Sequence, residues 1–134
     1  MNKSERRAAL LKGKGIAGAR KIFGNSAAEA LADIWSELDP QVGQAMCDHA
    51  YGTMYSREVL TQRERELCAV MTLTALDKQG ALGFHVKAAL QCGATREEVE
   101  EAIVQAHLYA GYPCVMSSLA TMKRVFSEVD GEKE

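Results

Sequence analysis

The sequence predicts an all-α protein, a single-domain bundle of about six helices. Apolar residues recur at intervals of three and four along most of the 134 residues, which is the spacing of one helix face. Alternating runs rich in valine, isoleucine and threonine, which strands would need, are missing. Three capping-box patterns, each with a hydroxyl residue three positions before a glutamate, mark helix starts within the chain.

The helix boundaries follow from these patterns and from the two prolines. The capping boxes pair Ser26 with Glu29, Thr61 with Glu64 and Thr95 with Glu98. Asp39 and Pro40 indicate a fourth start, since proline is favoured at the first helical position. Gly111 ends a helix and Pro113 opens the next one. We therefore expect helices near 26–38, 40–54, 61–77, 81–92, 95–110 and 113–128.

The two ends of the chain differ from this helical region. Residues 1–25 have a basic excess and contain four glycines, Gly13, Gly15, Gly18 and Gly24. Each glycine inside a helix costs about 1 kcal/mol relative to alanine. We expect residues 1–25 to be a mobile or partner-docked arm, residues 26–129 to be the helical domain, and residues 130–134 to be a frayed tail.

Composition and charge exclude several classes of partner. With 47% hydrophobic and 25% charged residues, the chain has the composition of a globular domain. A net charge of −2 and a pI near 5.9 argue against a nucleic-acid partner. No apolar run reaches the roughly 18 residues that cross a bilayer, and no apolar signal segment follows the N-terminus. We expect a cytoplasmic protein with a small-molecule substrate, no membrane partner and no nucleic acid.

A carboxylate and an imidazole fall on inward-facing positions of consecutive predicted helices. Glu66 lies beside the apolar stripe of 61–77, and His85 lies in the middle of the apolar face of 81–92. The short linker at 78–80 makes these helices antiparallel or sharply angled, so the two side chains can meet. A carboxylate fixes the tautomer of a histidine and supports proton transfer. A histidine packed in the core without a catalytic role is the alternative.

The spacing of the four cysteines is not that of a metal site. They are Cys47, Cys68, Cys92 and Cys114, and they form neither a CxxC motif nor a metal knuckle. We predict no metal and no disulfide. Cys68 and Cys114 are the possible reactive thiols, the latter because backbone N–H groups in the first turn of a helix favour a thiolate. Ordinary packing as small apolar side chains is the alternative for both.

The chain's four tyrosines lie near predicted helix ends, Tyr51 with Tyr55 and Tyr109 with Tyr112. A tyrosine has an apolar ring and a polar tip, so these residues suit the wall of a substrate pocket or a contact between subunits.

Four segments together carry a pattern of residues that one protein family shares: 51–57, 60–67, 85–98 and 105–113. In this order and spacing they resemble the carboxymuconolactone decarboxylase family, relatives of the alkylhydroperoxidase D proteins, over most of the chain. The resemblance implies the helical alkylhydroperoxidase D-like fold. It also implies a homo-oligomer, a trimer or a hexamer of three dimers, with sites near the subunit contacts.

This sequence departs from the peroxidase-type members of that family. In those proteins a CxxC motif follows the glutamate and ends four residues before the histidine. Anchored on Glu66 and His85, the two cysteine positions hold Lys78 and Ala81. A disulfide-exchange cycle needs two thiols close together, so the resemblance favours the decarboxylase branch, which keeps a histidine without the thiol pair.

The characteristic reaction of that branch converts 4-carboxymuconolactone to 3-oxoadipate enol-lactone with loss of carbon dioxide and without a cofactor. The resemblance then implies that His85 is the general acid and base and that Glu66 orients it or stabilises its protonated form. Arg57 or Arg65 is the candidate for gripping a substrate carboxylate.

Three functions stay open. The first is a cofactor-free lyase, and hence an enzyme, acting on a small anionic lactone or a related carboxylic acid. The second is a thiol-dependent antioxidant protein with peroxiredoxin activity that uses Cys68 or Cys114. The third is an oligomeric scaffold without catalysis.

Overall fold

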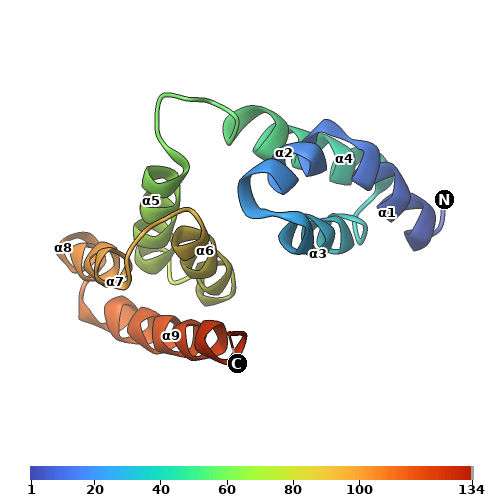
Figure 1. Ribbon diagram of the computed structural model, residues 1–134. Helices are drawn as coiled ribbons and strands as arrows, with labels where there is room; N and C mark the ends of the chain where they lie inside the picture. Colours follow the sequence, from blue (N-terminus) through green and yellow to red (C-terminus); the bar gives the residue numbers. More distant parts are fainter. Residues whose placement is uncertain (134) are drawn as a thin grey trace. The chain divides into compact units, whose positions relative to one another are not determined.

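The computed structural model describes residues 1–133, and every regular element within them is a helix (Figure 1). The predicted all-α class is confirmed. The chain divides into two compact units, an N-terminal unit over Met1–Leu60 and a C-terminal unit from Thr61 onward. Glu134, the last residue of the predicted tail, lies outside the described residues. Among residues 1–133, no helix combines the length and the apolar character that crossing a membrane requires.

The N-terminal unit consists of α1 (Lys3–Lys12), α2 (Lys14–Phe23), α3 (Asn25–Trp35), α4 (Pro40–His49) and the π-helix η1 (Ala50–Met54). The C-terminal unit consists of α5 (Gln62–Ala75), α6 (Gln79–Gln91), α7 (Arg96–Gln105), α8 (His107–Ala110) and α9 (Tyr112–Gly131). The expectation of about six helices is too low. Two of the predicted helices are each divided, 40–54 into α4 and η1, and 95–110 into α7 and α8 around Ala106. In addition, residues 1–25 contribute two more helices.

Residues 1–25, expected as an arm, form α1 and α2 because tertiary packing offsets the cost of their glycines. Gly15 and Gly18 lie where α2 crosses α4 and η1. A Cβ atom at either position would lie closer to the carbonyl oxygen of Cys47 or of Tyr51 than real Cβ contacts allow. The glycines therefore permit the close crossing through which α2 buries its apolar residues, such as Ile16.

Local capping signals predicted most helix starts correctly. The capping boxes of Thr61 and Thr95 are both formed, and the Asp39 side chain accepts hydrogen bonds from the first turn of α4. The box expected at Ser26 is wrong. Gly24, with φ of 87°, precedes α3 without any side-chain cap, and Glu29 accepts a hydrogen bond from Arg7 of α1 instead.

Several glycines end one helix and begin the next without a loop between them. Gly13 stands between α1 and α2, Gly24 between α2 and α3, and Gly111 between α8 and α9. Gly24 and Gly111 have positive φ values of 87° and 82°, which glycine adopts without steric cost. Because Gly111 is followed directly by α9, this helix begins at Tyr112, one residue before the predicted start.

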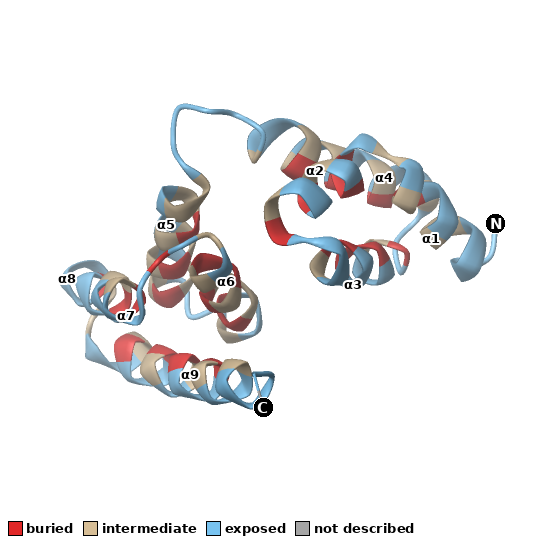
Figure 2. Ribbon diagram, viewed as in Figure 1, coloured by how far each residue is buried: buried red, intermediate tan, exposed pale blue. Residues whose placement is uncertain are grey.

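The core of the C-terminal unit lies between α5, α6, α7 and α9, which contact one another. Its buried residues include Val70, Leu82, Val86, Val99, Ile103, Met122 and Val125. In Figure 2, the buried positions of α9 follow the side of this helix that faces α6 and α7. This apolar packing fixes α5 against α6, the two helices that carry the predicted glutamate and histidine.

Candidate functional site

Glu66 lies inside the core of the C-terminal unit. The Thr61 capping box sets the start of α5, and the three buried residues of this helix, Glu66, Val70 and Thr74, follow at intervals of four. This spacing places them on one helix face. The sequence predicted Glu66 beside the apolar stripe, whereas the structure places it within the buried row.

His85 of α6 contacts Glu66 directly. Its Nδ1 atom lies 2.6 Å from Oε2 of Glu66, and the exposed fractions of the two side chains are 19% and 0%. An ionised carboxylate only accepts hydrogen bonds, so Nδ1–H is the donor and the ring is held in one tautomer. Nε2 makes no hydrogen bond with a described residue, and the ring is partly exposed. A reacting molecule could therefore exchange a proton with Nε2 while Glu66 holds the opposite side of the ring.

The other oxygen of Glu66 has no hydrogen-bond partner among the described residues. Oε1 is buried, so the bond to His85 is the one bond that the carboxylate makes there. Burying a charge without hydrogen bonds costs several kcal/mol. A hydrogen-bond donor next to the carboxylate offsets part of this cost, and the ring of His85 is the group that supplies one.

Cys92 is a neighbour of this pair that the sequence reasoning did not select. It is the C-cap residue of α6 and follows His85 by seven residues, which is about two helix turns on the same side. Burial raises the pKa of the Cys92 thiol, and the negative charge of Glu66 raises it further. Cys92 therefore brings a protonated thiol close to the carboxylate. In the sequence, the spacing of seven residues between His85 and Cys92 is what indicates that they share a helix side.

The remaining predicted binding residues are divided between the two units. Arg65 is half-buried on α5 next to Glu66, and Tyr109 is exposed on α8. Tyr51 and Arg57 belong to the N-terminal unit, where the Tyr51 ring packs at 6.2 Å from that of Phe23. The substrate-binding roles of these four residues stay predictions.

The four cysteines differ in accessibility. Cys68 is exposed on α5, Cys114 is half-buried in the first turn of α9, and Cys47 is buried on α4. Burial raises the pKa of the Cys47 thiol to about 11, with a smaller contribution from the charge of Asp48. Among residues 1–133, no three His, Cys, Asp or Glu side chains are grouped so that they could hold a metal ion.

These environments predict an order of thiol modification. With iodoacetamide at pH 8, Cys68 is expected to react first and Cys47 last, because alkylation requires an accessible thiolate. Peptide mass spectrometry over a time course measures the order. Because the pKa of the Cys47 thiol is about 11, raising the pH from 8 toward 11 should increase its alkylation rate by a larger factor in the folded protein than in urea, where the pKa returns to its ordinary value. Equal rates for Cys47 and Cys68 in the native protein would contradict the structure.

These observations define a class of protein: a helical protein in which a buried glutamate holds a histidine. The sequence profile of the carboxymuconolactone decarboxylase family matches residues 40–124. This match covers more than half of the chain and includes Glu66 and His85. The chain therefore belongs to the carboxymuconolactone decarboxylase family.

Individual relatives are identical to this chain at 28–32% of the aligned positions. A 4-carboxymuconolactone decarboxylase of Acinetobacter baylyi is 31% identical, over 60% of each chain. A nitrosuccinic acid decarboxylase of Metarhizium robertsii is 28% identical, over 65% of this chain and 62% of its own. An uncharacterized 15.0 kDa protein of Paracoccus denitrificans, from the nqo9–nqo10 intergenic region, is 32% identical, over 72% and 73%. The chain thus spans less than two thirds of the length of the two decarboxylases.

Proposed function

We propose that this protein is a cofactor-free lyase that decarboxylates a small anionic lactone or a related carboxylic acid. The observation that carries the proposal is the 2.6 Å contact between buried Glu66 and the partly exposed ring of His85. Two of the relatives support it through their names, which specify decarboxylation of a lactone acid and of a nitro acid. In both names the acid carries a group that withdraws electrons, and such a group can accept the electron pair that the departing carbon dioxide leaves behind.

The proposed reaction uses His85 as a proton donor. The carbon–carbon bond to the substrate carboxylate breaks, carbon dioxide leaves, and the electron pair moves into the electron-withdrawing group. Nε2–H of the protonated His85 then delivers a proton to the carbon that held the carboxylate. Glu66 stabilises the imidazolium before this transfer, and water restores the proton to the ring afterwards. The sum is one carboxylate and one proton converted to a C–H bond and carbon dioxide.

A cation is also needed to bind a substrate that keeps a negative charge. Arg65 is the candidate within the C-terminal unit, because it neighbours Glu66 on α5, and Arg57 is the candidate within the N-terminal unit. A guanidinium group can bind a carboxylate through two parallel hydrogen bonds. Tyr51 of the N-terminal unit and Tyr109 of the C-terminal unit each remain a proposed substrate-binding residue.

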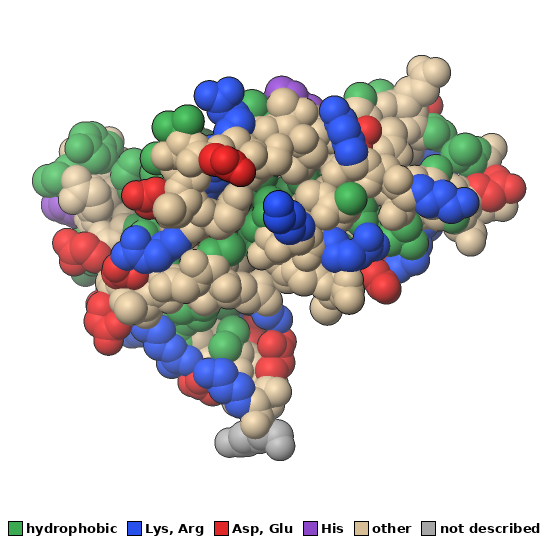
Figure 3. All heavy atoms as spheres, turned by 45° about the horizontal axis from the view of Figure 1, so that its top comes forward, with side chains coloured by type: hydrophobic (Ala, Val, Ile, Leu, Met, Phe, Trp, Pro, Cys, Tyr) green, Lys and Arg blue, Asp and Glu red, His purple; other side chains and the backbone are tan. Residues whose placement is uncertain are grey.

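Association of several copies, a trimer or a hexamer of three dimers, is part of the same proposal. The C-terminal unit exposes apolar side chains around α8 and the start of α9, namely Val104, Leu108, Tyr109, Tyr112 and Met116. Hydrophobic side chains gather around α8 in Figure 3. An exposed apolar patch of this kind is typical of a surface that another protein chain covers.

Turnover assays on cysteine variants test the proposed chemistry. Carbon dioxide release from 4-carboxymuconolactone and from nitrosuccinate is measured for the wild type, Cys68→Ser and Cys114→Ser. We expect turnover of at least one acid, with a kcat that neither substitution changes by more than about twofold, because no thiol takes part. Peroxide consumption that is lost in a cysteine variant would support the antioxidant function instead. Failure to process either acid or peroxide would favour the scaffold.

A further inference from the structure

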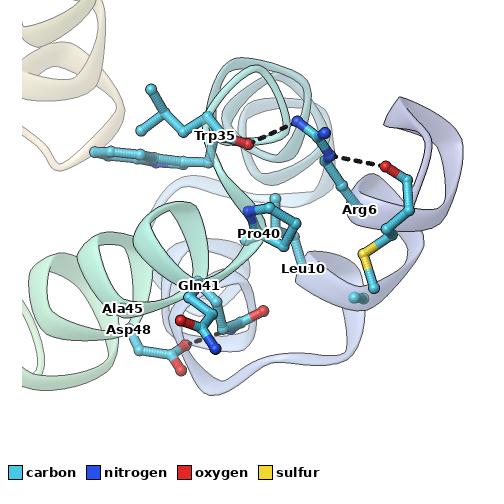
Figure 4. Close-up of a pocket in the computed structure, with 11 residues that line it drawn as sticks. Arg6, Leu10, Trp35, Pro40, Gln41, Ala45 and Asp48 are labelled. Carbon is cyan, nitrogen blue, oxygen red and sulfur yellow. Dashed lines mark hydrogen bonds between the residues drawn. The ribbon is translucent and has the colours of Figure 1, made fainter.

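A cavity lies entirely within the N-terminal unit, separate from the residues proposed for catalysis. It has a volume of about 430 Å³ and is lined by α1, the end of α3 and α4 (Figure 4). Its wall is mainly apolar and includes Leu10, Trp35, Leu38 and Pro40. More than half of the lining residues precede residue 40, where the family match begins. The pocket is therefore built partly from residues that lie outside the family match.

Arg6 supplies a fixed positive charge to this pocket. Its Nη1 donates a hydrogen bond to the carbonyl oxygen of Leu38 at 3.0 Å, and its Nε donates one to that of Met1 at 3.2 Å. These two bonds hold the guanidinium plane in place. Nη2 makes no hydrogen bond with a described residue, so the group keeps donors for a further acceptor.

Arg6 differs from the neighbouring cations of α1 because no carboxylate among the described residues neutralises it. Lys3 pairs with Glu37, and Arg7 pairs with both Glu29 and Asp33. A guanidinium group that the protein orients but does not pair is suited to binding an external anion.

The opposite side of the pocket carries a carboxylate, that of Asp48, which accepts its hydrogen bonds from within the protein. Oδ1 of Asp48 accepts hydrogen bonds from the backbone N–H of Gly15 at 2.7 Å and from Nε2 of Gln44 at 3.0 Å. Figure 4 shows Asp48 and Arg6 on opposite sides, with Pro40 and Leu10 between them. An anionic group can therefore bind Arg6 while the rest of the molecule lies against the apolar wall, away from Asp48.

The polar group that Arg6 leaves unsatisfied, Nη2, is a donor, so the pocket requires a ligand that brings acceptors rather than donors.

We propose that this pocket binds a small amphipathic carboxylate, a carboxylic acid with an apolar body. Its carboxylate accepts hydrogen bonds from Arg6, and its body packs on Leu10, Trp35 and Pro40. The volume lies near the lower end of the roughly 300–1,000 Å³ that small-molecule sites occupy, so the ligand is a small acid rather than a large lipid.

The single tryptophan of the chain makes this proposal directly measurable. Trp35 lines the pocket, so its fluorescence reports a bound ligand without any label. The full-length protein is titrated with octanoate below its micellar concentration, and a saturable change in Trp35 fluorescence is expected. Arg6→Gln should weaken binding by about 10-fold or more, since a hydrogen bond to a charged group contributes about 1.5–3 kcal/mol. The matched control is Arg20→Gln on the exposed side of α2, which should bind octanoate like the wild type.

Two further ligands separate charge recognition from simple filling of an apolar space. Octan-1-ol has the same body without the charge, and octylamine has the opposite charge. Octanoate is expected to bind at least about 10-fold more tightly than either. Equal binding of octanoate and octanol, tighter binding of octylamine, or an octanoate affinity unchanged in a folded Arg6→Gln protein would each overturn the proposal. Because the ligand comparison uses the wild type, it remains decisive if Arg6→Gln fails to fold.

Discussion

Replacing His85 by alanine is expected to lower the kcat of decarboxylation by about 100- to 10,000-fold, the contribution typical of a general acid. The reason is that the partly exposed His85 ring is held by a buried carboxylate and keeps Nε2 for the substrate. Glu66→Gln should cause a smaller loss and shift the pH–rate profile, since the amide can still accept a hydrogen bond from Nδ1–H but cannot stabilise the imidazolium. An unchanged kcat in His85→Ala would contradict the mechanism, while the fold and family would stand.

His85→Ala should also destabilise the C-terminal unit, because it leaves the Glu66 carboxylate buried without its hydrogen bond. Removing one partner of a fully buried pair costs about 3–5 kcal/mol, and the partial exposure of His85 reduces our expectation to about 2–3 kcal/mol. Adding Glu66→Leu to His85→Ala should recover most of this loss, since leucine fills the space without a charge.

This pair of variants separates a loss of chemistry from a loss of folding. Urea denaturation followed by circular dichroism measures the stability of each protein, and kcat measures its activity. The double variant is expected to be stable and inactive. If it regained activity together with stability, His85 would have only a structural role.

Gly15→Ala is expected to destabilise the N-terminal unit by about 1–3 kcal/mol or more, the usual cost of overpacking. The added methyl group would collide with the backbone of Cys47 and Asp48 where α2 crosses α4. It would also push away the backbone N–H of residue 15, which donates to Asp48. Backbone atoms cannot rotate aside as the end of a long side chain can, so the two helices must separate.

Trp35 fluorescence during urea denaturation reports this unit alone, because the single tryptophan of the chain lies on α3. The control is Gly80→Ala in α6, where an added Cβ meets no atom within 4 Å. Urea denaturation of this control, followed by circular dichroism because Gly80 lies in the C-terminal unit, should show the wild-type stability or a stabilisation of up to about 1 kcal/mol. A Gly15→Ala protein with the wild-type unfolding midpoint would show that α2 and α4 do not cross as closely as described.

The fold could be predicted wherever the controlling interaction is local. Thr61, Thr95 and Asp39 cap the helices that follow them through side-chain bonds that span two or three residues, so the sequence alone reveals them. The glycines of α2 have the opposite character. Their local effect disfavours a helix. They stabilise the fold through close contacts with residues more than 30 positions away, which no local sequence pattern shows.

The candidate site also has features that local sequence predicts and features that depend on tertiary packing. The positions of Glu66 and His85 on helix faces indicated that the two side chains can meet, and in the structure they do. The complete burial of Glu66 was not predicted, because it depends on how α7 and α9 cover α5. The pocket around Arg6 could not be predicted either, since it exists only because α1 folds onto α3 and α4.

The glycines that join one helix to the next also restrict where residues can be inserted into the chain. At Gly13, Gly24 and Gly111 the chain changes direction within a single residue, so an inserted residue there would shift a helix out of register with its packing partners. The longest segment without helix among residues 1–133 is 55–61, and most of its residues are exposed. Lengthening a flexible loop costs little free energy. Inserted residues, and tags or reporter domains introduced by engineering, should therefore be tolerated in this segment and at few other internal positions.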